Sequence, residues 1–167
     1  MKPQCAPKLA ETKLLDRTGL LKTLQDLRDS GHKIVFTNGC FDLLHPGHIR
    51  LLETARSFGD VLVVGVNADA SVKRLNKGSD RPINTELDRA LVMGALACVD
   101  YVSIFKEDTP IALIEKLAPD VHVKGGDYKA ESLPEYKTVT RGGGTVKIVP
   151  LVKGKSTTAT VKRLQQK

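Results

Sequence analysis

The sequence predicts an α/β fold, a single Rossmann-like doubly wound sheet of about five parallel strands. Short runs of β-branched and apolar residues recur along the 167 residues, and segments with helical apolar spacing separate them. The runs 34–37 (IVFT) and 61–66 (VLVVGV) are continuous instead of alternating, which is typical of parallel strands that are buried on both faces. In such a sheet, ligands bind beyond the carboxyl ends of the strands.

The N-terminal part reads as an arm followed by a helix. Residues 1–18 have no clear period and contain Pro3 and Pro7, which indicates a loose or clasping arm. Leu20, Leu24 and Leu27 then recur at helical spacing until Gly31. We therefore divide the chain into residues 1–32, an arm and helix, and residues 33–167, the main domain.

Strands and helices alternate through the main domain. The expected strands are residues 34–37, 61–66, 101–105, 121–124 and 146–149. One helix begins at Pro46 and stops before Gly59; a second carries Leu87, Leu91 and Ala95, with Thr85 as its N-cap. Two more are expected over residues 110–118 and 156–165. No internal repeat interrupts this order.

Composition narrows the possible partners. The formal charge of +7 favours anionic partners, but aromatic residues make up only 4% and no Lys/Arg block alternates with them. Nucleic acid is therefore not expected. No 18-residue apolar run and no apolar segment near the N-terminus is found, so neither a membrane span nor a signal peptide is expected. Three scattered cysteines favour a reducing cytoplasm.

The stretch from Asn38 to His48 carries the clearest chemistry. His45 and His48 are three residues apart at the start of a helix, and Gly47 lets the chain pass close to a ligand. Backbone N–H groups and the positive helix end suit phosphate, and two imidazoles can hold phosphate oxygens during phosphoryl or nucleotidyl transfer. Purely structural histidines and a zinc site are the alternatives. Zinc would need further ligands, and Cys5, Cys40 and Cys98 are scattered singly.

Other polar segments follow the predicted strands. Asn67 and Asp69 come after the second strand, and Lys73, Arg74, Lys77 and Arg81 belong to a basic, glycine-containing loop. The run 124–128 (KGGDY) ends the fourth strand, and Ser156, Thr157 and Thr158 open the last helix. A P-loop is excluded because Val149 stands where its first glycine is required. Asx turns, a solvated charge cluster, a tight turn and an N-cap are the structural alternatives.

These residues together resemble a known family. Residues 38–48 resemble the HxGH signature of the nucleotidyltransferase superfamily. With "RPIN", "ELDR" and "ALACVDYV" within 81–102, "DVHVKGGDY" at 120–128 and "GKSTT" at 154–158, the chain resembles the adenylyltransferases of ADP-heptose synthesis over about residues 33–165. No stretch is long enough for a sugar kinase domain as well, so the expected form is the stand-alone enzyme.

The resemblance implies a nucleotidyltransferase domain over 33–167 that transfers an adenylyl group from ATP to D-glycero-D-manno-heptose 1-phosphate, with Mg²⁺. It implies a cytoplasmic homo-oligomer, expected as a dimer, that serves lipopolysaccharide core synthesis. His45 and His48 would be catalytic, and Asp42, Asn67, Asp69 and Arg81 would bind the sugar phosphate. The nucleotide would be bound by Thr37, Asn38, Gly39, Cys40, Phe41, Gly47, Lys124, Gly125, Gly126, Asp127, Ser156, Thr157 and Thr158; no protein metal ligand is expected.

Two alternatives remain at this point. One is a cytidylyltransferase acting on glycerol 3-phosphate or a similar phosphorylated alcohol. Those enzymes carry threonine where this chain has Cys40 and arginine where it has Leu151, which disfavours this alternative. The other is a non-catalytic nucleotide- or nucleic-acid-binding module, which would bind in a salt-sensitive way without releasing pyrophosphate.

Overall fold

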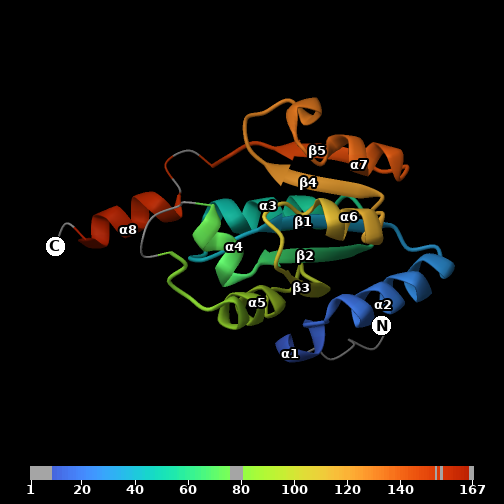
Figure 1. Cartoon of the computed structure of the whole chain (residues 1–167), viewed down its shortest axis with the longest axis horizontal. Coiled ribbons are helices and arrows are strands. Elements are labelled where there is room, and N and C mark those ends of the chain that lie inside the picture. Colours follow the sequence, from blue (N-terminus) through green and yellow to red (C-terminus); the bar gives the residue numbers. More distant parts are fainter. Residues whose placement is uncertain (1–8, 76–80, 153, 155, 166–167) are drawn as a thin grey trace, which may run out of the picture.

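The structure, a computed structural model, describes residues 9–75, 81–152, 154 and 156–165. In these residues it has one sheet of five parallel strands in the order β3-β2-β1-β4-β5 (Figure 1). The predicted fold class is confirmed. The strands are β1 (Ile34–Gly39), β2 (Val61–Asn67), β3 (Tyr101–Phe105), β4 (Val121–Gly125) and β5 (Thr145–Val149).

The strand order reverses between β1 and β4. From β1 the chain adds β2 and then β3 on one side, and it returns to place β4 and β5 on the other. Val35 is the register partner of Leu62 in β2 and of Val121 in β4. The carboxyl ends of β1 and β4 are therefore a topological switch point, where doubly wound sheets bind their ligands.

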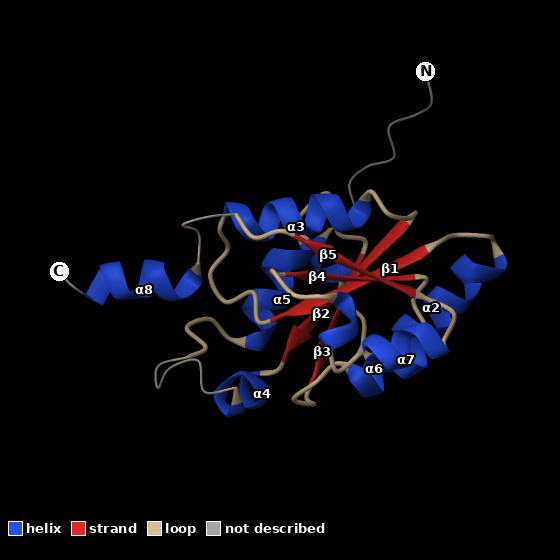
Figure 2. Cartoon of the chain, turned by 90° about the horizontal axis from the view of Figure 1, so that it is seen from above, coloured by secondary structure: helices blue, strands red, loops and turns tan. Residues whose placement is uncertain are grey.

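Helices cover both faces of the sheet (Figure 2). One core cluster joins one face to α3 and α5, through Leu52, Ala55, Ala90 and Met93. A second cluster joins the other face to α2, α6 and α7. The helices are α1 (Ala10–Lys13), α2 (Arg17–Asp29), α3 (Pro46–Arg56), α4 (Asp69–Arg74), α5 (Glu86–Gly94), α6 (Ile111–Leu117), α7 (Tyr136–Arg141) and α8 (Thr157–Gln165), with a 3₁₀ turn at Ala130–Ser132.

The helix expected around residues 87–95 is present as α5, but the leucines that mark it in the sequence are not buried. Leu87 is 64% exposed and Leu91 is 37% exposed. The buried residues of α5 are Arg89, Ala90, Met93 and Gly94, and the Thr85 side chain accepts from the Asp88 amide as expected of an N-cap. The leucines whose spacing marks this helix are thus not on its buried face, where a buried arginine, Arg89, lies instead.

The arm is ordered where the structure describes it. The Lys13 side chain is buried and donates from Nζ to the carbonyl oxygens of Leu96 at 3.1 Å and Val99 at 2.7 Å. Leu14 forms a parallel bridge with Val102 of β3. Residues 9–18 therefore clasp the β3 edge and are not loose. Residues 1–8, with Pro3, Cys5 and Pro7, lie outside the described residues.

Besides α1 in the arm, two short helices were not predicted from the sequence. α4 carries Lys73 and Arg74, which were expected in a loop, and α7 lies between β4 and β5. Each has six residues, less than two turns, so neither gives a legible helical period. Lys77 of the expected basic loop lies outside the described residues. Among the helices described, none has the length and apolar character needed to cross a membrane.

Candidate active site

A pocket of about 490 Å³ opens at the carboxyl ends of β1, β4 and β5. It lies at the predicted switch point, and most of the candidate residues line it. Leu51 of α3 and the segment 149–152 after β5, which the sequence analysis did not select, complete the wall. The candidates that line it are Asn38, Gly39, Cys40, Phe41, Asp42, His45, Gly47, His48, Arg81, Lys124, Gly125, Ser156, Thr157 and Thr158.

The two histidines stack at the start of α3. His45 occupies the N-cap position, and the His48 amide donates to the His45 carbonyl at 2.8 Å. Their ring centroids are 3.8 Å apart with planes inclined by 17°. A methyl group on Gly47 would lie 3.0 Å from Cε1 and Nδ1 of His45, so only glycine leaves this ring room to fold over the helix start. The pair presents imidazole nitrogens beside the helix N-terminus, a setting suited to phosphate oxygens.

The loop that carries the histidines is clamped through Asp42. The buried Asp42 carboxylate accepts from the Arg81 guanidinium, from the Ile83 amide at 2.9 Å and from the Asn84 amide at 3.0 Å. Burial alone would raise the pKa of Asp42, but the amide hydrogen bonds and Arg81 outweigh it and lower the pKa below 3.8. Asp42 and Arg81 therefore line the pocket as an ion pair, with the carboxylate charged at neutral pH.

Arg89 ties three segments together beneath this loop. Its guanidinium is buried and donates to the carbonyl oxygens of Cys40 at 2.5 Å, Asn67 at 2.7 Å and Asn84 at 3.0 Å. It also pairs with Asp69 at 2.7 Å. Sequence analysis missed Arg89, although it stands at an inward helical position next to Ala90 within the "ELDR" run.

Asn67 and Asp69 are not part of the pocket lining. Asn67 is buried and donates from Nδ2 to Ser71 Oγ at 3.0 Å, while its carbonyl and the Asp69 carboxylate face Arg89. Asn67 ends β2 and Asp69 begins α4, and both belong to the Arg89 network. Their substrate-binding role stays a prediction.

The β4 side of the pocket carries a cation and a narrow apolar slot. Lys124 Nζ lies 3.1 Å from Asn38 Oδ1 and 3.3 Å from Glu135 Oε1. A methyl group on Gly125 would lie 3.5 Å from Leu51 Cδ2 and 3.9 Å from Leu151 Cδ2. The slot over Gly125 between these leucines is suited to a flat, apolar group such as a nucleobase.

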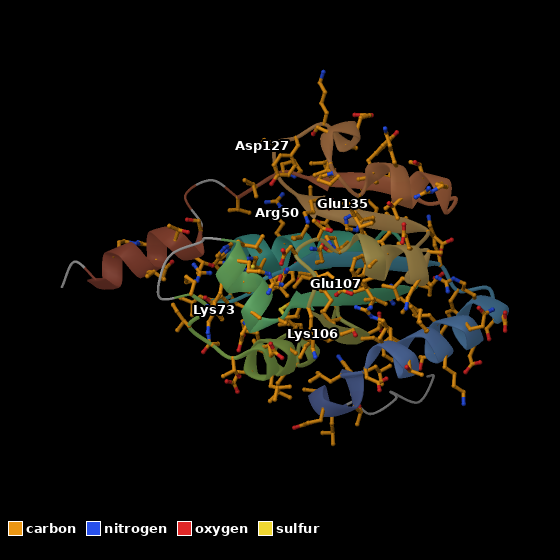
Figure 3. All side chains as sticks on the ribbon, viewed as in Figure 1. Arg50, Lys73, Lys106, Glu107, Asp127 and Glu135 are labelled. Atoms are coloured by element: carbon orange, nitrogen blue, oxygen red, sulfur yellow. The ribbon has the colours of Figure 1, made fainter. Side chains whose placement is uncertain are left out.

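Three candidates lie just outside this lining. Thr37 is buried and donates to the Val123 carbonyl at 2.8 Å, so it joins β1 to β4. The Gly126 amide donates to the Val149 carbonyl at 3.0 Å, and the Tyr128 ring covers Gly126 so closely that no Cβ would fit. Asp127 is exposed above the carboxyl end of β4 (Figure 3).

The start of α8 reaches the histidine loop from the far end of the chain. Thr157 Oγ1 donates to the Leu43 carbonyl at 3.1 Å. With this contact, the hydroxyl-rich segment 156–158 lines the same pocket as Lys124 and His48. As for metals, the described residues contain no group of three or more His, Cys, Asp or Glu that could hold an ion, so the zinc alternative gains no additional ligands there.

Comparisons with known proteins agree with this geometry. The family model described as cytidylyltransferase-like matches residues 36–160. The "Bifunctional protein HldE" of Geotalea uraniireducens is 49% identical over 156 residues, which are 93% of this chain and 32% of that protein. Its namesake from Geobacter metallireducens is 50% identical over 155 residues, 93% of this chain and 31% of that protein. The chain thus spans about a third of the length of these relatives.

Two solved structures are also similar. The lipopolysaccharide core biosynthesis protein from Thermoplasma volcanium is 31% identical with a TM-score of 0.61, over 75% of this chain and 100% of that one. The pantoate-beta-alanine ligase from Francisella tularensis, in complex with an ATP analogue and beta-alanine, is 17% identical with a TM-score of 0.53, over 82% of this chain and 66% of that one. At this identity the second similarity concerns the fold alone.

Proposed function

Because this chain belongs to the cytidylyltransferase-like family, we propose that it is a nucleotidyltransferase that transfers the adenylyl group of ATP to D-glycero-D-manno-heptose 1-phosphate. The products are ADP-heptose and pyrophosphate, and the pathway served is lipopolysaccharide core synthesis. The identity of about 50% to proteins named HldE, over 93% of this chain, supports the assignment of heptose 1-phosphate as the sugar substrate. The observation that carries the proposal is the stacked His45–His48 pair at the pocket, at the start of α3.

The reaction needs positioning and charge stabilisation, and no covalent enzyme intermediate. A phosphate oxygen of the sugar attacks the α-phosphorus of ATP; the new P–O bond forms as the bond from that phosphorus to the α,β-bridging oxygen breaks, and pyrophosphate leaves. His45 and His48 donate hydrogen bonds to the phosphate oxygens that gain charge. The helix N-terminus and residues 156–158 hold the remaining phosphates.

The donor set of the pocket fits a magnesium ion that enters with ATP. Among the described residues that line the pocket, the carboxylate is that of Asp42. Its oxygens already accept hydrogen bonds from Arg81 and from two backbone amides. We therefore assign Mg²⁺ to the triphosphate, where it neutralises the leaving pyrophosphate.

We assign the adenine to the slot over Gly125. The proposal also includes a cytoplasmic location and a homodimer; the exposed Leu87, Leu91 and Val92 of α5 support the homodimer.

Pyrophosphate release tests the proposal. The purified chain, with Mg²⁺, is given ATP or CTP, each paired with either anomer of the heptose 1-phosphate or with glycerol 3-phosphate. We expect release with ATP and one heptose anomer. Release with CTP and glycerol 3-phosphate would assign the chain to the cytidylyltransferases instead. Nucleotide binding without release in any pairing would favour a non-catalytic module.

A further inference from the structure

A buried carboxylate lies behind the pocket and has no role in the reaction described above. Glu135 precedes α7, and its side chain is 4% exposed. A single oxygen, Oε1, lies 3.3 Å from Lys124 Nζ and 3.3 Å from His122 Nε2. Glu135 itself does not line the pocket, whereas Lys124 does. The carboxylate therefore contacts the pocket through the lysine.

Lys124 is held from two sides. Its ammonium group has three N–H donors, and two acceptors surround it, Glu135 Oε1 at 3.3 Å and Asn38 Oδ1 at 3.1 Å. The Lys124 side chain is 24% exposed, and it reaches the pocket from the end of β4. Two fixed acceptors direct the third N–H, and the positive charge, toward a ligand in the pocket.

The charge states of the cluster agree with this arrangement. Burial alone would raise the pKa of Glu135, but the His122 hydrogen bond and the Lys124 charge outweigh it and lower the pKa to about 2. Burial lowers the pKa of His122, so the imidazole is neutral at pH 7 and its Nε2–H donates to Glu135. The ion pair is thus between Glu135 and Lys124, and His122 orients the carboxylate.

We propose that Glu135 is a positioning residue, which holds the Lys124 ammonium against Asn38 so that it meets an anionic or hydrogen-bond-accepting group of the bound nucleotide. A lysine side chain has four rotatable bonds, and fixing them before binding lowers the entropy lost when the ligand arrives. This inference rests on the proposed function for the identity of the nucleotide. It names a residue that acts only through Lys124.

A double-mutant cycle on ATP affinity tests it. Affinity is measured calorimetrically with Mg-ATP for wild type, Glu135→Gln, Lys124→Met and the double variant. When Lys124 is present, we expect Glu135→Gln to weaken ATP binding about tenfold, because one charge-assisted contact is misdirected. In the Lys124→Met background, we expect the same substitution to weaken binding less than about twofold. Glu131→Gln is the matched control, because Glu131 is exposed on the 3₁₀ turn nearby; its affinity should equal that of wild type.

Two results would overturn the proposal: unchanged affinity in Glu135→Gln, or an equal loss in both backgrounds, which would mark a structural role. If Glu135→Gln does not fold, Glu135→Asp takes its place, because it keeps the charge but shortens the reach. It should weaken binding about threefold with Lys124 and not without it. Affinity can be measured without turnover, so the mutant cycle tests this proposal even if no pyrophosphate is released. If the wild-type protein binds only CTP, CTP replaces ATP in the titrations.

Discussion

The two halves of the pocket are built by different physical means. On the β1–β2 side, two buried arginines fix the loop after β1: Arg81 grips the Asp42 carboxylate, and Arg89 satisfies the Cys40, Asn67 and Asn84 carbonyls. On the β4–β5 side, the described lining has a partly exposed cation, Lys124, beside an apolar slot at Gly125. Two buried arginines hold the first half, whereas the second joins an ion pair, between Lys124 and Glu135, to an apolar slot shaped by packing.

The difference matches what each half must do. The stacked histidines follow an irregular loop between β1 and α3, whose backbone groups lack sheet or helix partners and need others when buried. Arginine, with five donors in a fixed fork, provides them. A flat nucleobase needs only a narrow space between side chains, which Leu51 and Leu151 leave over Gly125.

The sharpest test of the β1–β2 half removes an imidazole. His48→Ala is expected to lower kcat by about 100-fold or more, because it deletes a hydrogen-bond donor to the phosphate oxygens as they gain charge. The measurement is pyrophosphate release at saturating ATP and sugar phosphate. His32→Ala is the matched control: His32 is exposed in the turn before β1 and should leave kcat unchanged. A His48→Ala rate within threefold of wild type would remove His48 from the mechanism.

Breaking the clamp beneath the loop should cost stability. Arg89→Met leaves the Asp69 carboxylate and three carbonyl oxygens without their donor, so we expect the free energy of unfolding to fall by about 3–5 kcal/mol in urea titrations. Arg141→Met is the control, since Arg141 is exposed and lies 3.7 Å from Glu115; its effect should be about 0–1 kcal/mol. Equal effects in both variants would show that Arg89 does not hold the loop.

The same contrast explains how much of the molecule could be predicted from sequence. β2 was the most legible strand because it is a continuous apolar run, and α3 was legible because Pro46 and three apolar positions (Ile49, Leu52 and Ala55) mark it. α4 and α7 were not, since a helix of six residues presents less than two turns of pattern. The inward face of α5 was missed because its largest buried side chain is Arg89, which apolar periodicity does not reveal.

For the site, the sequence revealed the residues that belong to local motifs, but not the residues that act through tertiary contacts. The histidine loop, the 124–125 segment and 156–158 were found because each follows a strand or opens a helix. Arg89 and Glu135 were not, because their roles depend on contacts with residues far away in sequence, such as Cys40 and Lys124. Asn67 and Asp69 were selected by position alone, and the contacts to Arg89 were not visible in the chain.

A single methyl group should sharpen the description of the β4–β5 half. Gly125→Ala places a methyl 3.5 Å from Leu51, an ordinary contact, so the fold and Tm should be unchanged. The methyl fills the slot, and we expect the KM for ATP to rise about tenfold, as loss of good base packing implies, with a smaller change in kcat. Gly142→Ala, whose methyl would lie 3.5 Å from the Val139 carbonyl oxygen and away from the pocket, is the control. An unchanged KM in Gly125→Ala would place the base elsewhere.

The smallest expected effect is on the stability of the fold at acidic pH. Burial lowers the pKa of His122 in the folded protein below its ordinary 6.5, so on acidification the unfolded chain takes up a proton that the folded chain refuses. Stability should therefore fall as the pH drops below about 6.5. His122→Gln should show a smaller loss of Tm between about pH 7 and about pH 5 than wild type.

His32→Gln, in which an exposed histidine is replaced, should keep the full loss. The carboxylates with lowered pKa values, Asp42, Glu107 and Glu135, have ordinary values of 3.8, 4.5 and 4.5, so their contribution is lost below this window. An identical loss in wild type and His122→Gln would mean that the imidazole behind Glu135 is protonated in the folded state. The Glu135 carboxylate would then face two cations, His122 and Lys124, and the β4–β5 half would depend on charge more than on packing.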